Sequence, residues 1–88
     1  MNWKIEIKPN AEKQYLKLDK KMKKRIKRLL SQLGESEYPF FNINVKSLTG
    51  ELRGDYRLGV GKWRILLKPD KKRKVLYVYA IIPRGKAY

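Results

Sequence analysis

Residues 20–33 place all of their apolar side chains on one side of a helix, and this stretch constrains the fold more than any other. Most of the remaining residues there are Lys or Arg, and the apolar set is Met22, Ile26, Leu29, Leu30 and Leu33. A helix with a single apolar stripe must bury that stripe against a second layer. Asp19 is suited to cap this helix, and Gly34 is suited to end it.

A strand and a short helix are expected before this segment. Residues 3–8 alternate apolar and charged side chains, which is the period of a half-buried strand. Pro9 is expected to end the strand, and Asn10 to cap a helix over residues 11–18. The first half of the chain is therefore predicted to form a strand followed by two helices.

The second half of the chain has the residue pattern of several short strands. Residues 35–44 contain a proline and several turn formers and are expected to form a loop. The expected strands cover residues 45–48, 52–58, 63–68 and 75–82, with turns at 59–62 and 69–72. The last strand is apolar on both faces, as in a central strand. The pattern predicts one α+β domain over residues 1–88, with an N-terminal strand and two helices packed on an antiparallel sheet.

Charge predicts the class of partner. The chain has 23 Lys and Arg against eight Asp and Glu, a formal net charge of +15, so a polyanion is the expected ligand. It has no His and no Cys, which excludes an imidazole base, a thiolate nucleophile and an ordinary zinc site, so we expect no metal or cofactor. No apolar run approaches the ~20 residues that span a bilayer. We expect a cytoplasmic protein without membrane contact.

The most densely charged segment is residues 20–28. A solvated helix face opposite the apolar stripe is one interpretation. The other is a ridge that follows a phosphate backbone, because like charges one turn apart repel and a nearby polyanion would relieve that repulsion. In the second interpretation the RNA-contacting residues of the helix are Lys23, Lys24 and Lys27.

A more specific signal comes from residues 52–66, which are expected to form a hairpin. Arg53 and Arg57 would share one strand, and Arg64 would lie on the next. Cross-strand neighbours lie about 5 Å apart, so a guanidinium cluster can form on the sheet. An ordinary surface ion pair with Asp55 or Glu51 is the alternative. The sequence leaves both open.

Four short motifs together carry a family resemblance: LTG at 48–50, DYRL at 55–58, GKWRI at 61–65 and PRGKAY at 83–88. In these motifs the chain resembles the RelE/ParE superfamily of toxins from toxin–antitoxin pairs, and more narrowly the archaeal RelE toxins. The resemblance implies a microbial-RNase-like fold and cleavage of messenger RNA in the ribosomal A site. It also implies an acidic RelB-like antitoxin, bound in a heterodimer or heterotetramer.

The resemblance assigns roles to individual residues. Arg57 would contact phosphate, Arg64 would hold the phosphate under attack, and Arg84 would be the leaving-group acid or a charge stabiliser. Tyr88 corresponds to a terminal tyrosine of the family's active site. Many members carry a second basic residue where this chain has Gly59. The other residues expected to contact RNA are Arg53, Lys62 and Lys86.

The chemistry is consistent with these residues. RNA supplies its own nucleophile, the 2′-hydroxyl, and converging guanidinium groups can stabilise the developing phosphorane. Tyrosine is a poor base at neutral pH, so such a site should be weak alone and depend on the ribosome to align its substrate. Two alternatives stay open: a ParE-type toxin that binds a protein such as gyrase, and a non-catalytic RNA-binding module in which Tyr77 and Tyr79 stack on bases.

Overall fold

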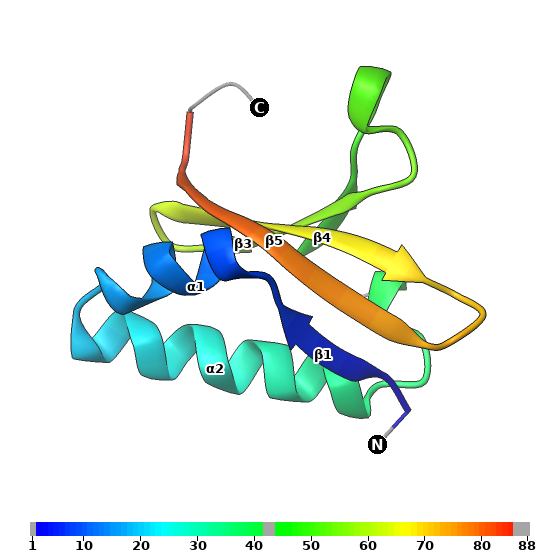
Figure 1. Ribbon diagram of the computed structural model, residues 1–88, viewed down its shortest axis with the longest axis horizontal. Coiled ribbons are helices and arrows are strands. Elements are labelled where there is room, and N and C mark those ends of the chain that lie inside the picture. Colours follow the sequence, from blue (N-terminus) through cyan, green and yellow to red (C-terminus); the bar gives the residue numbers. More distant parts are fainter. Residues whose placement is uncertain (1, 42–43, 86–88) are drawn as a thin grey trace.

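The computed structural model describes residues 2–41 and 44–85, which form two helices against one five-stranded sheet of order β1-β5-β4-β3-β2 (Figure 1). Both helices lie on the same face of the sheet (Figure 1). This is the α+β arrangement that the sequence predicts. In chain order the elements are β1 (Lys4–Ile7), α1 (Pro9–Leu16), α2 (Lys20–Glu35), the 3-10 turn η1 (Pro39–Phe41), β2 (Val45–Ser47), the 3-10 turn η2 (Gly50–Leu52), β3 (Tyr56–Val60), β4 (Trp63–Asp70) and β5 (Val75–Pro83).

The main core lies between α2 and the sheet. Ile26, Leu30 and Leu33 of the predicted stripe are buried, and Met22 and Leu29 pack at its margin. They meet alternate residues of the three inner strands: Leu58, Val60, Ile65, Leu67, Leu76 and Val78. Asp19 caps the helix as predicted, since its carboxylate accepts a hydrogen bond from the Met22 N–H at 2.8 Å. The apolar pattern of the sequence thus fixes which face of α2 is buried.

The predicted helix ends need two corrections. The first helix begins at Pro9, with Lys8 and not Asn10 at the cap position. Proline suits the first helical position because the N–H it lacks has no partner there. Gly34 does not end α2, which continues to Glu35.

Gly34 is required by a close approach of β1 to α2. The N–H groups of Asn2 and Trp3 both donate to the Gly34 carbonyl oxygen, at 3.0 and 2.8 Å. A Cβ atom on Gly34 would lie 3.0 Å from the Trp3 carbonyl oxygen and 3.2 Å from a carbon of the Ile5 side chain. Glycine therefore serves packing at this position, where the sequence suggested a stop signal.

The sheet is mixed: the antiparallel sheet that the sequence predicts is confirmed for β2 to β5, and only the direction of the N-terminal strand is not given by the sequence. β2 to β5 pair antiparallel, but β1 runs parallel to β5, with Ile5 opposite Leu76. Tight turns force antiparallel pairing between neighbours in the chain. No such turn joins β1 to β5, so its direction is set by tertiary packing.

The strand expected over 52–58 is wrong in its first half. β3 begins at Tyr56, and the residues before it form η2 and a turn at Gly54, whose φ is +99°. Gly59 lies inside β3 and not in the following turn, which is centred on Gly61 with a φ of +57°. Arg53 and Arg57 are therefore not on one strand.

The sheet face away from the helices carries a smaller apolar cluster. Leu48, Leu66 and Ala80 are buried there, and Leu52, Tyr79 and Ile82 are partly covered. β5 is thus less completely covered on this face than the sequence predicts. β4 runs on to Asp70, so Pro69 and Asp70 belong to the strand and the tight turn follows them.

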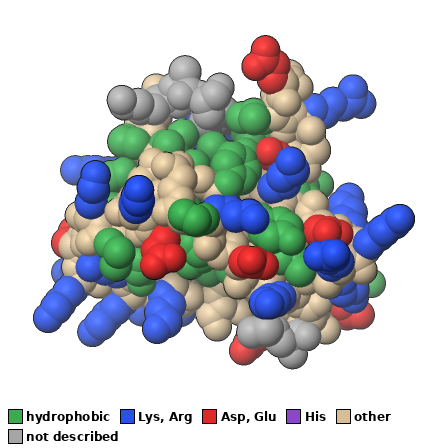
Figure 2. Space-filling model, in the orientation of Figure 1, with side chains coloured by type: hydrophobic (Ala, Val, Ile, Leu, Met, Phe, Trp, Pro, Cys, Tyr) green, Lys and Arg blue, Asp and Glu red, His purple; other side chains and the backbone are tan. Residues whose placement is uncertain are grey.

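Within the described residues, neither helix combines the length and the apolar character needed to span a bilayer. Lys and Arg side chains instead project along the edge of the molecule where α2 runs (Figures 1 and 2).

Replacing Gly34 by Ala should destabilise the protein by about 1–3 kcal/mol, because the new methyl carbon would lie 3.0 Å from the Trp3 carbonyl oxygen, and the two hydrogen bonds to the Gly34 carbonyl keep that backbone from moving away. In an unobstructed helix the same change stabilises, by about 0.5–1 kcal/mol. Urea unfolding measures the difference, and Gly59→Ala is the matched control, since no atom lies within 4 Å of its added Cβ. A stabilised Gly34→Ala protein would contradict the packing argument.

Replacing Asp19 by Ala should cost about 1 kcal/mol of the free energy of unfolding, because the Met22 N–H loses its capping partner. Asp19→Asn should retain most of the stability, since an amide oxygen can accept the same bond. Thermal unfolding of the two variants tests the cap; equal losses in both would assign the effect to the carboxylate charge.

Candidate active site

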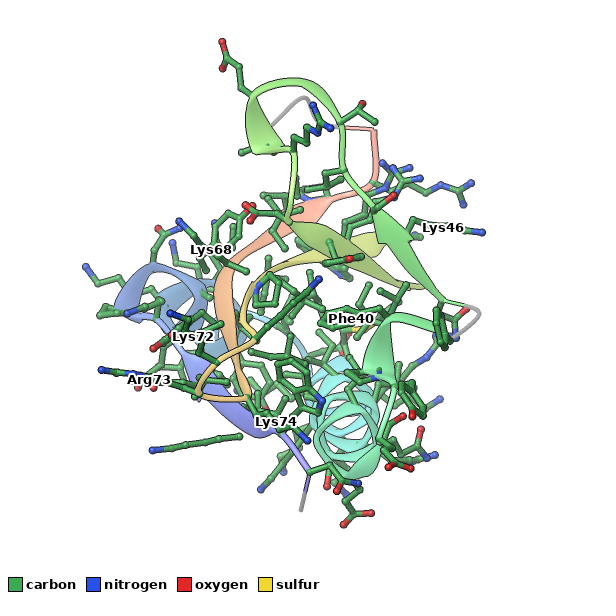
Figure 3. The ribbon with its side chains drawn as sticks, turned by 90° about the vertical axis from the view of Figure 1, so that its right-hand side faces the viewer. Phe40, Lys46, Lys68, Lys72, Arg73 and Lys74 are labelled. Carbon is green, nitrogen blue, oxygen red and sulfur yellow. The ribbon has the colours of Figure 1, made fainter. Side chains whose placement is uncertain are left out.

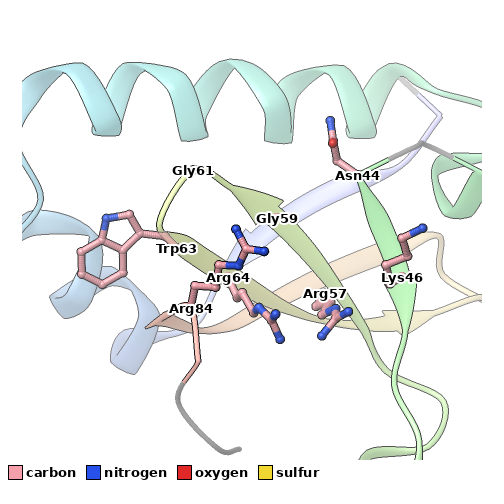
Figure 4. Close-up of a pocket in the computed structure, with 8 residues that line it drawn as sticks. All are labelled: Asn44, Lys46, Arg57, Gly59, Gly61, Trp63, Arg64 and Arg84. Atoms are coloured by element: carbon pink, nitrogen blue, oxygen red, sulfur yellow. The ribbon is translucent and has the colours of Figure 1, made fainter.

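An open depression gathers four cationic side chains from four different segments (Figure 4). Lys46 comes from β2, Arg57 from β3, Arg64 from β4, and Arg84 follows the end of β5. The remaining lining residues are Asn44, Gly59, Gly61 and Trp63. The structure therefore brings together the three arginines that the sequence analysis selected.

Strand register places Arg57 and Arg64 on one face. Arg64 pairs with Gly59, which lies two residues after Arg57 on β3. Residues two apart on a strand share a face, so the two arginines are diagonal neighbours, about 7–8 Å apart at the backbone. The intervening Leu58 is buried in the core on the helix side. Both arginines are half-buried, so part of each side chain packs on the sheet.

Arg84 reaches the same site because β5 ends beside the β3–β4 turn. Pro83 pairs with Trp63, and the Arg84 N–H donates to the Lys62 carbonyl oxygen at 2.6 Å. This bond fixes the backbone from which the Arg84 side chain extends. Lys62 and Arg84 also share the wall of an adjoining hollow, so Lys62 lies next to the site, and its contact with RNA stays a prediction.

Lys46 is a site residue that sequence reasoning missed. It pairs directly with Arg57 across the β2–β3 ladder, and Val45 beside it is buried. The alternation of Asn44, Val45 and Lys46 could have indicated a half-buried strand with Lys46 on its outer face. The register that sets Lys46 opposite Arg57 could not be predicted from this alternation. A shift of the strand pairing by one residue would move every side chain of the strand to the other face of the sheet.

Gly59 forms the floor of the depression. Its N–H donates to the Asn44 carbonyl oxygen at 3.0 Å, and on the other side it pairs with Arg64. A Cβ atom at this position would meet no atom within 4 Å. The departure from the family pattern at Gly59 therefore leaves space between the cationic side chains.

One carboxylate considered as a partner for the arginines is engaged elsewhere. Asp55 accepts a hydrogen bond from the Tyr79 hydroxyl group at 2.9 Å. Both side chains line a separate hollow with Leu52 and Tyr77. Glu51 lies in η2, outside the residues that line the arginine depression.

Arg53 is not brought to the site. It lines a different hollow, formed by residues 47–50 and 53–56, because β3 begins only after it. Tyr88 and Lys86, the other predicted tail residues, lie outside the described residues.

Helix α2 presents a different cation to the site from those predicted. A Cβ atom on Gly61 would lie 3.3 Å from Arg25 Nη1, so this guanidinium group borders the depression. Successive helical residues turn by about 100°, so Lys23 and Lys27 emerge from the opposite flank. Lys27 lines a groove with Ile5 and Tyr15, and the Lys23 carbonyl oxygen accepts from the Tyr15 hydroxyl at 3.2 Å.

The angular position of Lys24 lies between those of Arg25 and Lys23, and its side chain is exposed, away from the sheet. The contacts of Lys23, Lys24 and Lys27 with RNA stay predictions. The helical periodicity that identified the apolar stripe could also have separated the two flanks, given the position of the sheet.

Positive charge is not confined to the depression. Lys72, Arg73 and Lys74 occupy the β4–β5 turn, at a distance from Lys46 (Figure 3). Charge density alone therefore does not locate the site. What distinguishes the depression is the convergence of half-buried guanidinium groups around an empty floor. In the described part of the chain, no three side chains that could ligate a metal ion lie together.

This arrangement can bind a phosphate group and stabilise additional negative charge on it. Guanidinium groups form paired hydrogen bonds to phosphate oxygens, and partial burial strengthens each interaction by excluding water. The preorganised cations would favour a phosphorane over the ground-state diester, because the phosphorane carries more charge.

Comparison of the sequence with protein-family models gives no match, and no curated protein matches it. Several solved structures match the fold of this chain. The archaeal RelE–RelB complex from Pyrococcus horikoshii aligns with a TM-score of 0.81 and 26% identity over 99% of this chain and 100% of that chain. The intact E. coli RelBE toxin–antitoxin complex aligns at 0.75 with 16% identity, covering 96% and 99%. The YoeB dimer from Staphylococcus aureus aligns at 0.74 with 22% identity, covering all of both chains.

These structures share the two helices and the mixed sheet along nearly their whole length. The resemblance stated from the sequence motifs is therefore confirmed at the level of structure: the chain has the fold of RelE-type toxins of the RelE/ParE superfamily.

Proposed function

We propose that this chain is the toxin of a toxin–antitoxin pair and a metal-independent endoribonuclease that cleaves messenger RNA in the ribosomal A site. The observation that carries the proposal is the convergence of Arg57, Arg64 and Arg84 on one depression of the helix-free sheet face. The likeness to RelE toxins supports the same reaction class.

The reaction follows from what the residues offer. The 2′-hydroxyl of the messenger gives up its proton to solvent and attacks the adjacent phosphate, which forms a 2′,3′-cyclic phosphate. The bond from phosphorus to the 5′-oxygen of the next nucleotide breaks, and that oxygen takes up a proton from solvent. Arg57 and Arg64, diagonal on the sheet, would hold the equatorial phosphate oxygens. Arg84, on the exposed segment after β5, would meet the charge that develops on the leaving oxygen.

The open shape of the site explains a need for the ribosome. The depression is open and is formed by side chains on a sheet, with exposed Lys46 and Arg84 at its margin. Most of the described side chains that line it are cations suited to phosphate, and Asn44 and Trp63 are the other two. A scaffold that holds the messenger in a cleavable conformation would supply the missing orientation. Action on the ribosome would place the protein in the cytoplasm.

The ParE-type alternative is not favoured. The structural neighbours include RelE and YoeB toxins, and the arginine cluster suits a phosphate better than a protein surface. The non-catalytic RNA-binding module is likewise disfavoured, because Tyr77 and Tyr79 are half-buried beside Leu52 and one tyrosine hydroxyl bonds to Asp55.

The proposed partner is an acidic RelB-like antitoxin. Structures with the same fold from Pyrococcus horikoshii and E. coli are toxin–antitoxin complexes. The net charge of +15 would favour an acidic chain wrapped around the surface, because neutralisation relieves self-repulsion in the folded state.

Arg64→Ala should reduce cleavage of a translated messenger by about 10²- to 10³-fold, because Arg64 meets charge that appears during the reaction. Primer extension on messenger from a reconstituted translation system measures the cleavage. Lys72→Ala is the matched control, since Lys72 is exposed in the β4–β5 turn and does not line the depression, and it should change the rate by less than about threefold.

Free RNA in the same buffer should be cleaved far more slowly than the translated messenger. Intact messenger in both reactions, with correctly folded wild-type protein, would reject the nuclease. Equal loss of activity in Arg64→Ala and Lys72→Ala would show that only the total charge matters.

Binding of the antitoxin should raise the unfolding temperature of this chain, because a ligand that binds only the folded state stabilises it by mass action. The antitoxin is sought as a small acidic protein encoded beside this gene. Unfolding of the toxin alone and of the mixture, followed by fluorescence, measures the shift. An unrelated acidic protein of similar charge is the control, and an equal shift with both proteins would contradict a specific complex.

A further inference from the structure

We propose that Lys46 is a phosphate-contacting residue of this site, and that it supplies from β2 the positive charge that Gly59 does not supply from β3. The inference rests on the proposed function and identifies a fourth cation of the same site. It follows from strand pairing and from the empty space above Gly59.

Strand pairing places Lys46 beside the arginines. Lys46 lies directly opposite Arg57 in the β2–β3 ladder and lines the same depression as the three arginines (Figure 4). Direct cross-strand neighbours lie about 5 Å apart, closer than the diagonal pair of Arg57 and Arg64. A phosphate held by Arg57 is therefore within reach of the Lys46 ammonium group.

β2 is held firmly enough to present Lys46 there. Val45 is buried, with 6% of its surface exposed, and packs in the main core. The Gly59 N–H bonds to the Asn44 carbonyl oxygen, and three residue pairs join β2 to β3. Lys46 thus has a fixed backbone and an exposed, flexible side chain.

The space above Gly59 is open to a side chain from β2. Any larger side chain there would stand between Asn44 and Arg64 and next to Arg57. A Cβ atom at Gly59 meets nothing within 4 Å, so the position is open. The four-carbon stem of a lysine on the neighbouring strand can extend over this opening, whereas a filled floor would obstruct it.

The charges of Lys46 and Arg57 repel each other. Placing Lys46 beside Arg57 sets two like charges opposite each other on adjacent strands, an arrangement that destabilises a sheet. A bound phosphate would offset this cost, because its oxygens can accept from both side chains. Lysine acts as a mobile point charge, and the arginine forks fix the orientation of the phosphate.

Lys46→Met removes the charge and keeps most of the stem. It should reduce cleavage of a translated messenger by about tenfold, less than the loss of an arginine that meets developing charge. The double variant Lys46→Met/Gly59→Lys should recover the rate to within about threefold of wild type, because it restores a cation to the floor of the site. Gly59 has room for this side chain and a φ outside the left-handed region, so the substitution should not unfold β3.

Lys68→Met is the matched control, because Lys68 is an exposed strand lysine that does not line the depression. It should cleave like the wild type. The unfolding midpoints of all variants are measured, so that loss of a phosphate contact can be distinguished from loss of protein stability. Wild-type cleavage by Lys46→Met would overturn the inference, and so would a loss that Gly59→Lys does not recover.

A second measurement keeps the inference testable if the wild type does not cleave. Binding of a short single-stranded RNA oligonucleotide is titrated at several salt concentrations. Removing one phosphate contact lowers the slope of log K against log salt by about 0.7. That reduction in Lys46→Met but not in Lys68→Met would support the contact even if the proposed nuclease fails. Equal slopes in both variants would overturn it.

Discussion

The burial of one stripe of α2 against one face of the sheet is the interaction on which the rest of the structure depends. Ile26, Leu30 and Leu33 take up the core side of the helix, and alternate residues of the inner strands meet them. Because a strand alternates its side chains, burying Leu58 and Ile65 sends Arg57 and Arg64 to the opposite face. The arginine cluster is thus a geometric consequence of the core.

The same segregation accounts for how a small, strongly basic chain remains folded. Apolar side chains are concentrated between the layers, and the cations lie on the surface, where water screens them. The depression is the exception, because four cations from β2, β3, β4 and the end of β5 converge on it. Their mutual repulsion makes the site attractive to a polyanion, and the bare floor at Gly59 leaves space for a phosphate among them.

Several features could be predicted from local sequence because local physics decides them. The apolar period identified α2, Asp19 identified its start, and the motif around Arg57 and Arg64 identified two strands. Predictions failed where one residue type serves two purposes. Gly34 has the sequence context of a helix stop, but it permits close packing of β1. Gly54 falls inside a strand predicted from the sequence, but it forms a turn, and Arg53 therefore lies outside the site.

The sequence was enough to predict a polyanionic ligand, and it fixed the buried face of α2 and the arginines of the candidate site, since charge, helical period and motif are local properties. Tertiary structure alone decided that Lys46 and Arg25 border that site while Lys23 and Lys27 lie on the other flank. It also decided that β1 runs parallel to β5. The physical reason is that strand register and helix orientation are set by contacts between residues far apart in the chain, and no short segment carries that information.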